Sequence, residues 1–125
     1  MKEIITTKNA PQAIGPYSQA VLANGILFSS GQIAINPQTN QLVLDNIESE
    51  TNQVMKNLKA VLKAANMDFS DVVKCTIFLK DMNQYSSINE VYQKYFKQNP
   101  PAREAVQVSE LPKSVNIEIS AIAVK

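Results

Sequence analysis

The sequence predicts a single α+β domain spanning residues 1–125. A chain of this length can build one hydrophobic core, and its composition, 45% hydrophobic and 18% charged, is typical of a globular protein. Two segments carry apolar residues at helical spacings of three and four, and the other apolar runs are short and strand-like. Their order, ββββ-α-β-α-ββ, predicts a mixed β-sheet with two helices packed on one face.

The N-terminal part is predicted to contain only strands and loops. Residues 3–7 form a short first strand, and residues 9–17, with two prolines and a glycine, form a loop. The apolar runs 19–23 and 26–29 are separated by Asn24-Gly25, a dipeptide that favours a tight hairpin because both positions tolerate positive φ. A first hairpin is therefore expected here.

The second apolar run is interrupted at Ser30-Gly31-Gln32, where a glycine allows a bulge or a close approach of the backbone to a ligand. Residues 33–44 then suggest a looser hairpin. A first helix is expected to begin at Asp45, because Glu48 three residues later resembles a capping box. Asn66 is a plausible left-handed residue at its end. The apolar face of this helix comprises Ile47, Thr51, Val54, Leu58, Val61, Leu62 and Ala65.

The C-terminal half is predicted to be β-α-β-β. Residues 72–80 form a strand that is nearly apolar on both faces and therefore central. Residues 83–97 form a second amphipathic helix, which Pro100-Pro101 stops. Residues 103–108 and 115–124 are the last two strands. The inward face of the second helix comprises Tyr85, Ile88, Val91, Tyr92, Tyr95 and Phe96. Two helices on one sheet face leave the other face bare, and oligomerisation is the economical way to cover it.

Composition excludes several classes of chemistry. The chain has no histidine and one cysteine, so Ser-His-Asp and Cys-His machinery, His-ligated metal sites and intrachain disulfides are impossible. Cys75 lies in an apolar strand, where a buried inert thiol is expected. The net charge of +1 offers no electrostatic footprint for nucleic acid or an anionic membrane. The single cysteine fits a reduced, cytoplasmic compartment. Residues 1–8 lack a signal-peptide core, and no apolar run approaches the ~20 residues of a membrane span.

Two charged residues are the main candidates for chemistry. Arg103 is the only arginine among twelve cationic residues, and only arginine offers a rigid planar fork that grips a carboxylate with two parallel hydrogen bonds. The alternative is a surface arginine that starts a strand. Glu118 shares one strand face with Asn116 and Ser120, opposite the apolar face. It is either a solvent-facing glutamate or a carboxylate in an interface cleft that holds a water or pairs with Arg103.

Weaker candidates surround them. Tyr17 follows the rigid Gly15-Pro16 turn, and Ser30 and Gly31 supply a hydroxyl and free backbone donors at a strand break. Asn89 lies on the second helix, one residue away from the apolar stripe. Each of these residues could equally serve packing or turn formation.

Taken together, five segments resemble the Rid/YjgF family of reactive-intermediate deaminases, in the same order and spacing from Asn9 to Val124. These segments are residues 13–20 (AIGPYSQA), 29–33 (SSGQI), 80–83 (KDMN), 101–106 (PAREAV) and 117–123 (IEISAIA). The resemblance implies a chorismate-mutase-like protomer and a homotrimer with three clefts between subunits. It also implies hydrolysis of 2-imino acids and their enamines, such as 2-aminoacrylate, to 2-keto acids and ammonia, without cofactor or metal.

The resemblance also implies residue roles. Arg103 falls on the family's carboxylate-binding arginine, and Glu118 on the glutamate thought to position or activate the attacking water. The cleft-lining positions of the family fall on Tyr17, Ser30, Gly31 and Asn89, and the backbone of Ala105 is expected to contact the substrate.

The chain departs from the commonest family pattern at one place, where Glu104-Ala105 replaces Ser-Cys after the arginine. On an extended strand Glu104 should point away from Arg103, so the two side chains should not pair. A non-catalytic trimer that binds a small carboxylate metabolite is the alternative function, and Glu118 favours the enzyme. The neutral charge and the absence of histidine argue against a role in RNA binding or cleavage.

Overall fold

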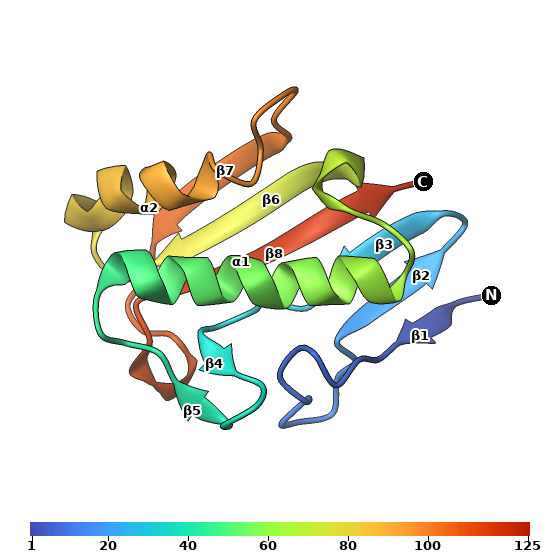
Figure 1. The fold of residues 1–125 in the computed structure, drawn as a ribbon, viewed down its shortest axis with the longest axis horizontal. Coiled ribbons are helices and arrows are strands. Elements are labelled where there is room, and N and C mark those ends of the chain that lie inside the picture. Colours follow the sequence, from blue (N-terminus) through green and yellow to red (C-terminus); the bar gives the residue numbers. More distant parts are fainter.

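The computed structural model describes residues 1–125, and it confirms the predicted α+β architecture: two helices lie on one face of a mixed sheet (Figure 1). The strands are β1 Glu3–Ile5, β2 Ala20–Ala23, β3 Ile26–Ser29, β4 Ile35–Asn36, β5 Gln41–Leu42, β6 Val72–Leu79, β7 Ala102–Gln107 and β8 Ile117–Val124. The helices are α1 Ile47–Ala64 and α2 Tyr85–Tyr92, with 3-10 turns η1 Phe69–Asp71, η2 Met82–Gln84 and η3 Pro112–Ser114.

The main sheet has six strands in the order β1-β2-β3-β8-β6-β7, and β4 and β5 pair separately. Every neighbouring pair in the main sheet is antiparallel except β6 and β7, which are parallel. That parallel pair requires a crossover, and α2 provides it. The C-terminal strand β8 therefore lies in the middle of the sheet, although it is the last element of the chain.

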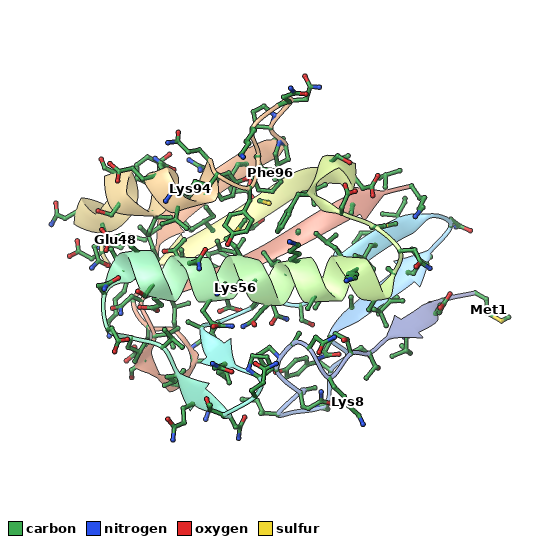
Figure 2. All side chains as sticks on the ribbon, viewed as in Figure 1. Met1, Lys8, Glu48, Lys56, Lys94 and Phe96 are labelled. Carbon is green, nitrogen blue, oxygen red and sulfur yellow. The ribbon has the colours of Figure 1, made fainter.

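The hydrophobic core fills the space between the sheet and both helices. Leu58 and Leu62 of α1, Ile88 of α2 and Ile77 and Ile119 of the sheet are all about 1% exposed or less. Burial of each such side chain stabilises the fold by about 1.5–3 kcal/mol. Most charged side chains of α1, such as Glu48 and Lys56, are exposed to solvent (Figure 2).

The turns predicted from asparagine and glycine are confirmed. Asn24 and Gly25 have φ of 52° and 77°, so the β2–β3 hairpin uses two left-handed residues as expected. Asn40, with φ of 60°, lies in the predicted looser hairpin between β4 and β5. Asn66, with φ of 58°, follows α1. Its N–H donates to a carbonyl of the last turn in the pattern of a Schellman motif.

The start of α1 differs by one residue from the expectation. The helix is capped by Asn46, whose side chain accepts a hydrogen bond from the Ser49 N–H at 2.7 Å. The capping box predicted at Asp45 and Glu48 is therefore wrong. Asn46 has the extended backbone of an N-cap, and this places Asp45 outside the helix.

The second helix is shorter than predicted. Regular α-helix covers only Tyr85–Tyr92, and the chain continues to Phe96 through tight turns with i to i+3 hydrogen bonds. Strand 115–124 is also shorter, because β8 begins at Ile117. These differences concern only the ends of elements, where propensity is weakest.

One face of the sheet is bare in the single chain. On β6 Cys75 and Ile77 are buried under the helices, whereas Phe78 on the other face is only half-buried. The prediction that this strand is central is confirmed, because β6 lies between β8 and β7. Phe28 and Val124 on neighbouring strands are 46% and 42% exposed. An apolar face of this kind needs a cover, as the sequence analysis anticipated. No helix in the structure has the length and apolarity needed to cross a bilayer.

Candidate functional site

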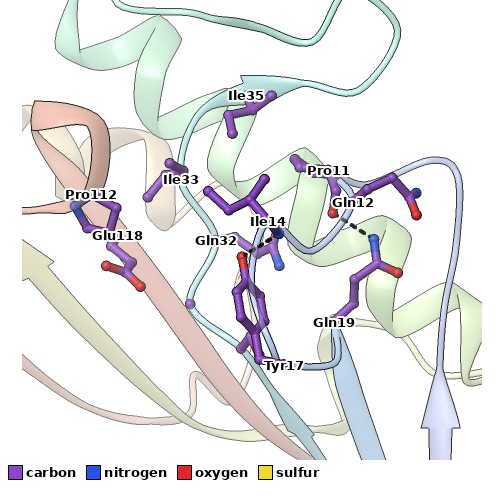
Figure 3. A pocket seen from close by; sticks show the side chains of 12 residues that line it. Pro11, Gln12, Ile14, Tyr17, Gln19, Gln32, Ile33, Ile35, Pro112 and Glu118 are labelled. Atoms are coloured by element: carbon purple, nitrogen blue, oxygen red, sulfur yellow. Dashed lines mark hydrogen bonds between the residues drawn. The ribbon is translucent and has the colours of Figure 1, made fainter.

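A pocket of about 300 Å³ lies beside β8, between the loop 11–19 and the segment 30–35 (Figure 3). Apolar side chains from both segments form much of its wall, and Pro112 borders one side. The polar groups that line it include the Tyr17 side chain and the Glu118 carboxylate. A largely apolar cavity with a few convergent polar groups is typical of a small-molecule site.

Glu118 lies on the sheet face that the helices leave free. Its neighbours Ile117 and Ile119 are fully buried on the helix side, so strand alternation turns Glu118 the other way, as predicted. The side chain is half-buried, and this loss of solvation raises the pKa of its carboxyl above the ordinary value. A raised pKa makes the carboxylate a stronger base toward a water molecule.

Gly31 packs directly against this carboxylate. A Cβ added at residue 31 would lie 1.9 Å from Oε2 of Glu118 and 2.7 Å from its Cδ. The backbone of Gly31 has no positive φ, so the glycine is required for space rather than for conformation. Two hydrogen bonds between Gln32 and Ile119, of 2.8 and 3.1 Å, hold the segment beside β8. The glycine therefore allows a close approach to the Glu118 side chain, and the approach of its backbone to a ligand stays a prediction.

Tyr17 and Ser30 complete this side of the site. The Tyr17 ring is 50% exposed, and its hydroxyl oxygen accepts a hydrogen bond from the Ile14 N–H at 3.3 Å, so its proton is free for donation (Figure 3). The Ser30 hydroxyl donates to the Ser18 carbonyl at 2.6 Å and can only accept toward the pocket. The structure thus brings four of the predicted residues together: Tyr17, Ser30, Gly31 and Glu118.

Arg103 belongs to a second cluster, at the edge of the sheet under α2. Its Nη1 donates to the Asn89 side-chain oxygen at 2.8 Å, and its Nη2 donates to the Tyr85 hydroxyl at 2.6 Å. The guanidinium also lies over the Tyr92 ring, 4.9 Å from its centroid. Ala105 is half-buried on the same strand face, two residues further along β7. Arg103 is therefore a held, oriented arginine rather than a solvated one.

Glu104 points away from Arg103, as expected for an extended strand. Its carboxylate accepts a hydrogen bond from the Thr76 hydroxyl at 2.7 Å and pairs with Lys74 at 3.0 Å, both on the bare face of the sheet. The hydrogen bond from Thr76, and after it the interaction with Lys74, hold the pKa of Glu104 below its usual range. The unusual Glu104 therefore leaves the guanidinium free.

The two clusters lie on opposite faces of the same sheet. Glu118 projects from the bare face, while Arg103 projects toward α2 and bonds to it. Glu118 and Arg103 therefore do not pair within one chain, and their pairing in an interface cleft, one of the alternatives drawn from the sequence, stays a prediction. Each chain therefore carries two separate candidate clusters, which we name the Glu118 half-site and the Arg103 half-site.

Buried polar side chains that the sequence analysis did not single out anchor the pocket walls. Gln19 is 4% exposed; its Oε1 accepts from the Thr7 N–H at 2.7 Å, and its Nε2 donates to the Pro11 carbonyl at 2.7 Å. These bonds tie the start of the loop that carries Tyr17 to Gln19, the residue directly before β2. The sequence signal that could have revealed this role is the position of Gln19, two residues after the Gly15-Pro16-Tyr17 turn.

Two further anchors come from α1. Asn57 donates from Nδ2 to the carbonyls of Ile33 and Ile35, both at 3.0 Å, and so fixes another pocket wall. Glu50 is fully buried and accepts from the backbone and side-chain amides of Asn116, at 2.8 and 2.7 Å, just before Glu118. Both residues interrupt the apolar face of the helix, and a polar residue in such a stripe is the signal that could have revealed them.

No group of three or more histidine, cysteine, aspartate or glutamate side chains is arranged to hold a metal ion.

Comparison with known proteins decides the family. The family model described as Endoribonuclease L-PSP matches residues 7–125. The chain belongs to this family, the Rid/YjgF family. A Pyrococcus horikoshii protein named as a RutC family protein is 54% identical over 125 residues, which cover 100% of this chain and 99% of the relative. The human 2-iminobutanoate/2-iminopropanoate deaminase is 48% identical over 125 residues, covering 100% of this chain and 91% of the human protein.

The fold is also that of Rid proteins. The crystal structure of a Rid-family protein from Yersinia pestis superimposes with a TM-score of 0.98 at 52% identity and covers both chains completely. The sequence resemblance to the Rid/YjgF family is therefore confirmed over nearly the whole chain.

Proposed function

We propose that this Rid protein hydrolyses 2-imino acids, such as 2-iminopropanoate and 2-iminobutanoate, to 2-keto acids and ammonia. The observation that carries the proposal is the pair of half-sites: an oriented arginine with unused donors, and a half-buried carboxylate with a raised pKa beside an apolar pocket. The membership of a human imine deaminase in the same family, at 48% identity, supports it.

The proposed reaction needs little from the protein. Arg103 binds the substrate carboxylate through two parallel charge-assisted hydrogen bonds, each worth about 1.5–3 kcal/mol. Glu118 accepts a proton from a water molecule whose oxygen adds to C2 of the imine, giving a carbinolamine. The protonated Glu118 carboxyl returns this proton to the nitrogen, the hydroxyl proton passes through the Glu118 carboxylate to the nitrogen as the keto group forms, and the C–N bond breaks so that ammonia leaves. Tyr17 and the backbone at Gly31 and Ala105 are proposed to orient the substrate.

The two half-sites must meet for this chemistry, and we propose that they meet between chains of a homotrimer. Within one chain they lie on opposite sheet faces, so one chain cannot bring Arg103 and Glu118 to the same substrate. The bare sheet face, with Phe28 and Val124 nearly half exposed, gives the apolar surface that such an assembly would bury. Three chains of 13.8 kDa would give a particle of about 41 kDa.

The activity is tested by generating 2-iminobutanoate in situ with an L-amino acid oxidase and trapping the survivors as semicarbazones. The wild-type protein should lower the yield of semicarbazone, and Arg103→Ala and Glu118→Gln should not. If the wild-type protein leaves the yield unchanged but still binds 2-oxobutanoate in a titration, the protein is a carboxylate-binding module and the deaminase proposal fails.

A subunit-complementation experiment tests the shared cleft. Arg103→Ala and Glu118→Gln chains, each inactive alone, are unfolded, mixed in equal amounts and refolded together. If each cleft takes its arginine from one chain and its glutamate from a neighbour, random trimers should recover about a quarter of the wild-type activity. Separately refolded variants, mixed afterwards, are the control. No recovery in co-refolded trimers of the expected mass would contradict the shared cleft.

A further inference from the structure

The Tyr85 hydroxyl carries a proton that the Arg103 half-site does not use. Tyr85 opens α2 and is half-buried, and Asn89 lies one helical turn later on the same face. Both residues accept a hydrogen bond from Arg103: the Tyr85 oxygen lies 2.6 Å from Nη2, and Asn89 Oδ1 lies 2.8 Å from Nη1. Because the tyrosine oxygen accepts this bond, its own O–H remains a donor beside the guanidinium.

The neighbouring Tyr92 serves as an internal comparison. Its ring also lies against the guanidinium, with the ring centroid 4.9 Å from the guanidinium carbon. Its buried hydroxyl, however, has no oxygen or nitrogen atom as a hydrogen-bond partner. Tyr92 therefore supports Arg103 only through its ring. Tyr85 supports it through both ring and hydroxyl, since its centroid lies 5.4 Å from the guanidinium carbon.

The donor count indicates what the half-site recognises. A guanidinium has five N–H donors, of which two are occupied by Tyr85 and Asn89. The remaining N–H groups and the Tyr85 O–H are all donors, and the half-site presents no free carboxylate to them, because Glu104 points to the opposite face. A planar anion with several lone pairs satisfies such a set, whereas a neutral amide offers one acceptor oxygen and brings donors of its own.

We propose that Tyr85 is a second carboxylate-binding residue: its oxygen fixes the plane of the Arg103 guanidinium, and its O–H donates to the same substrate carboxylate. This inference rests on the proposed function of the Arg103 half-site. It makes Tyr85 a determinant of specificity for free 2-imino and 2-keto carboxylates over their amides. The hydroxyl, rather than the ring, carries the effect.

Tyr85→Phe is the test, and Tyr95→Phe is its matched control. Tyr95 follows α2, and its hydroxyl bonds to Asn52 of α1 rather than to the half-site, so the control removes the same atom from a remote place. Affinity is measured by titration with 2-oxobutanoate, the stable keto acid, and with 2-oxobutanamide. Tyr85→Phe should weaken 2-oxobutanoate binding about tenfold and narrow its preference over the amide, while Tyr95→Phe stays within about twofold of wild type.

A second readout follows Arg103 itself. It is the only arginine in the chain, so its guanidinium ¹⁵N–H signals are identified without assignment. Two bonded Nη groups should rotate slowly and give resolved signals in wild type and Tyr95→Phe, and the signals should average in Tyr85→Phe. Both readouts are independent of turnover. If the wild-type protein binds 2-oxobutanoate but does not hydrolyse imines, only the deaminase proposal is refuted.

Three results would overturn the role of Tyr85. The first is wild-type affinity and unchanged guanidinium signals in Tyr85→Phe. The second is an equal loss of affinity for the carboxylate and the amide, which would reduce Tyr85 to packing. The third is a wild-type protein that binds no 2-oxobutanoate at all.

Discussion

Gly31→Ala should separate catalysis from stability. The new Cβ would lie 1.9 Å from Oε2 of Glu118, so the carboxylate must retreat by about 1.5 Å to reach ordinary van der Waals contact. A misplacement of about 1 Å in a catalytic group can cost roughly 100-fold in rate, so we expect kcat for 2-iminobutanoate to fall by about that factor. Substrate affinity should change less, because Arg103 holds the carboxylate from the other half-site.

The folding stability of Gly31→Ala should be equal to or slightly higher than that of the wild type. Gly31 is exposed and has no positive φ, so alanine fits its backbone and stiffens the unfolded chain, which contributes about 0.4–1 kcal/mol. Gly25→Ala is the matched control: Gly25 has a φ of 77°, and a Cβ there would meet only the Lys125 carbonyl oxygen, at an ordinary 4.0 Å, so alanine is strained by about 1–2 kcal/mol without touching either half-site.

The assay combines semicarbazide trapping with thermal unfolding of the three proteins at one subunit concentration. Gly31→Ala should lose activity and keep its melting temperature, and Gly25→Ala should do the reverse. If Gly31→Ala kept more than half of the wild-type kcat, the contact between Gly31 and Glu118 would have no catalytic meaning and the water-positioning role of Glu118 would have to be abandoned.

Three further predictions follow from the same contacts. Arg103→Lys should be nearly as inactive as Arg103→Ala in the trapping assay, because lysine keeps the charge but loses the planar fork; substantial activity in the lysine variant would contradict a bidentate clamp. Glu118→Gln should raise the melting temperature near neutral pH. Burial raises the pKa of the Glu118 carboxyl in the folded protein, so the wild type loses folding stability as the pH rises from the pKa of the unfolded chain to that of the folded protein. The gain in melting temperature from Glu118→Gln should therefore vanish in acid, below the ordinary glutamate pKa. A gain that does not depend on pH would refute this reasoning. Asn57→Ala should lower the free energy of unfolding by about 2 kcal/mol in chemical denaturation, because it removes two buried hydrogen bonds, to the carbonyls of Ile33 and Ile35, and leaves the Ile33 carbonyl only its bond from the Ile35 N–H; a change under about 0.5 kcal/mol would mean that water replaces the amide.

Most of the fold was predictable because its determinants are local. Helical spacing located α1 and α2, Asn24-Gly25 located the first hairpin, and Asn66 located the end of α1. The exact start of α1 was not predictable, because Asp45 and Asn46 are both good caps and the choice between them depends on how the preceding chain leaves the sheet.

The sequence alone also determined the family and the identity of the charged candidates. A lone arginine, a glutamate in a strand of alternating pattern and the absence of histidine are all visible without coordinates. Alternation even placed Glu118 on the face opposite Ile117 and Ile119, because that relation is internal to one strand.

Only the tertiary structure decided how these residues are grouped. Whether Arg103 and Glu118 share a face depends on the order and register of three strands that are distant in sequence, β7, β6 and β8, and no local propensity encodes that pairing. The reason for Gly31 is likewise non-local: its space is taken by a carboxylate 87 residues later in the chain. The sequence identified Arg103 and Glu118 as candidates, and strand pairing places them on opposite faces of one sheet, so that one chain does not bring them together.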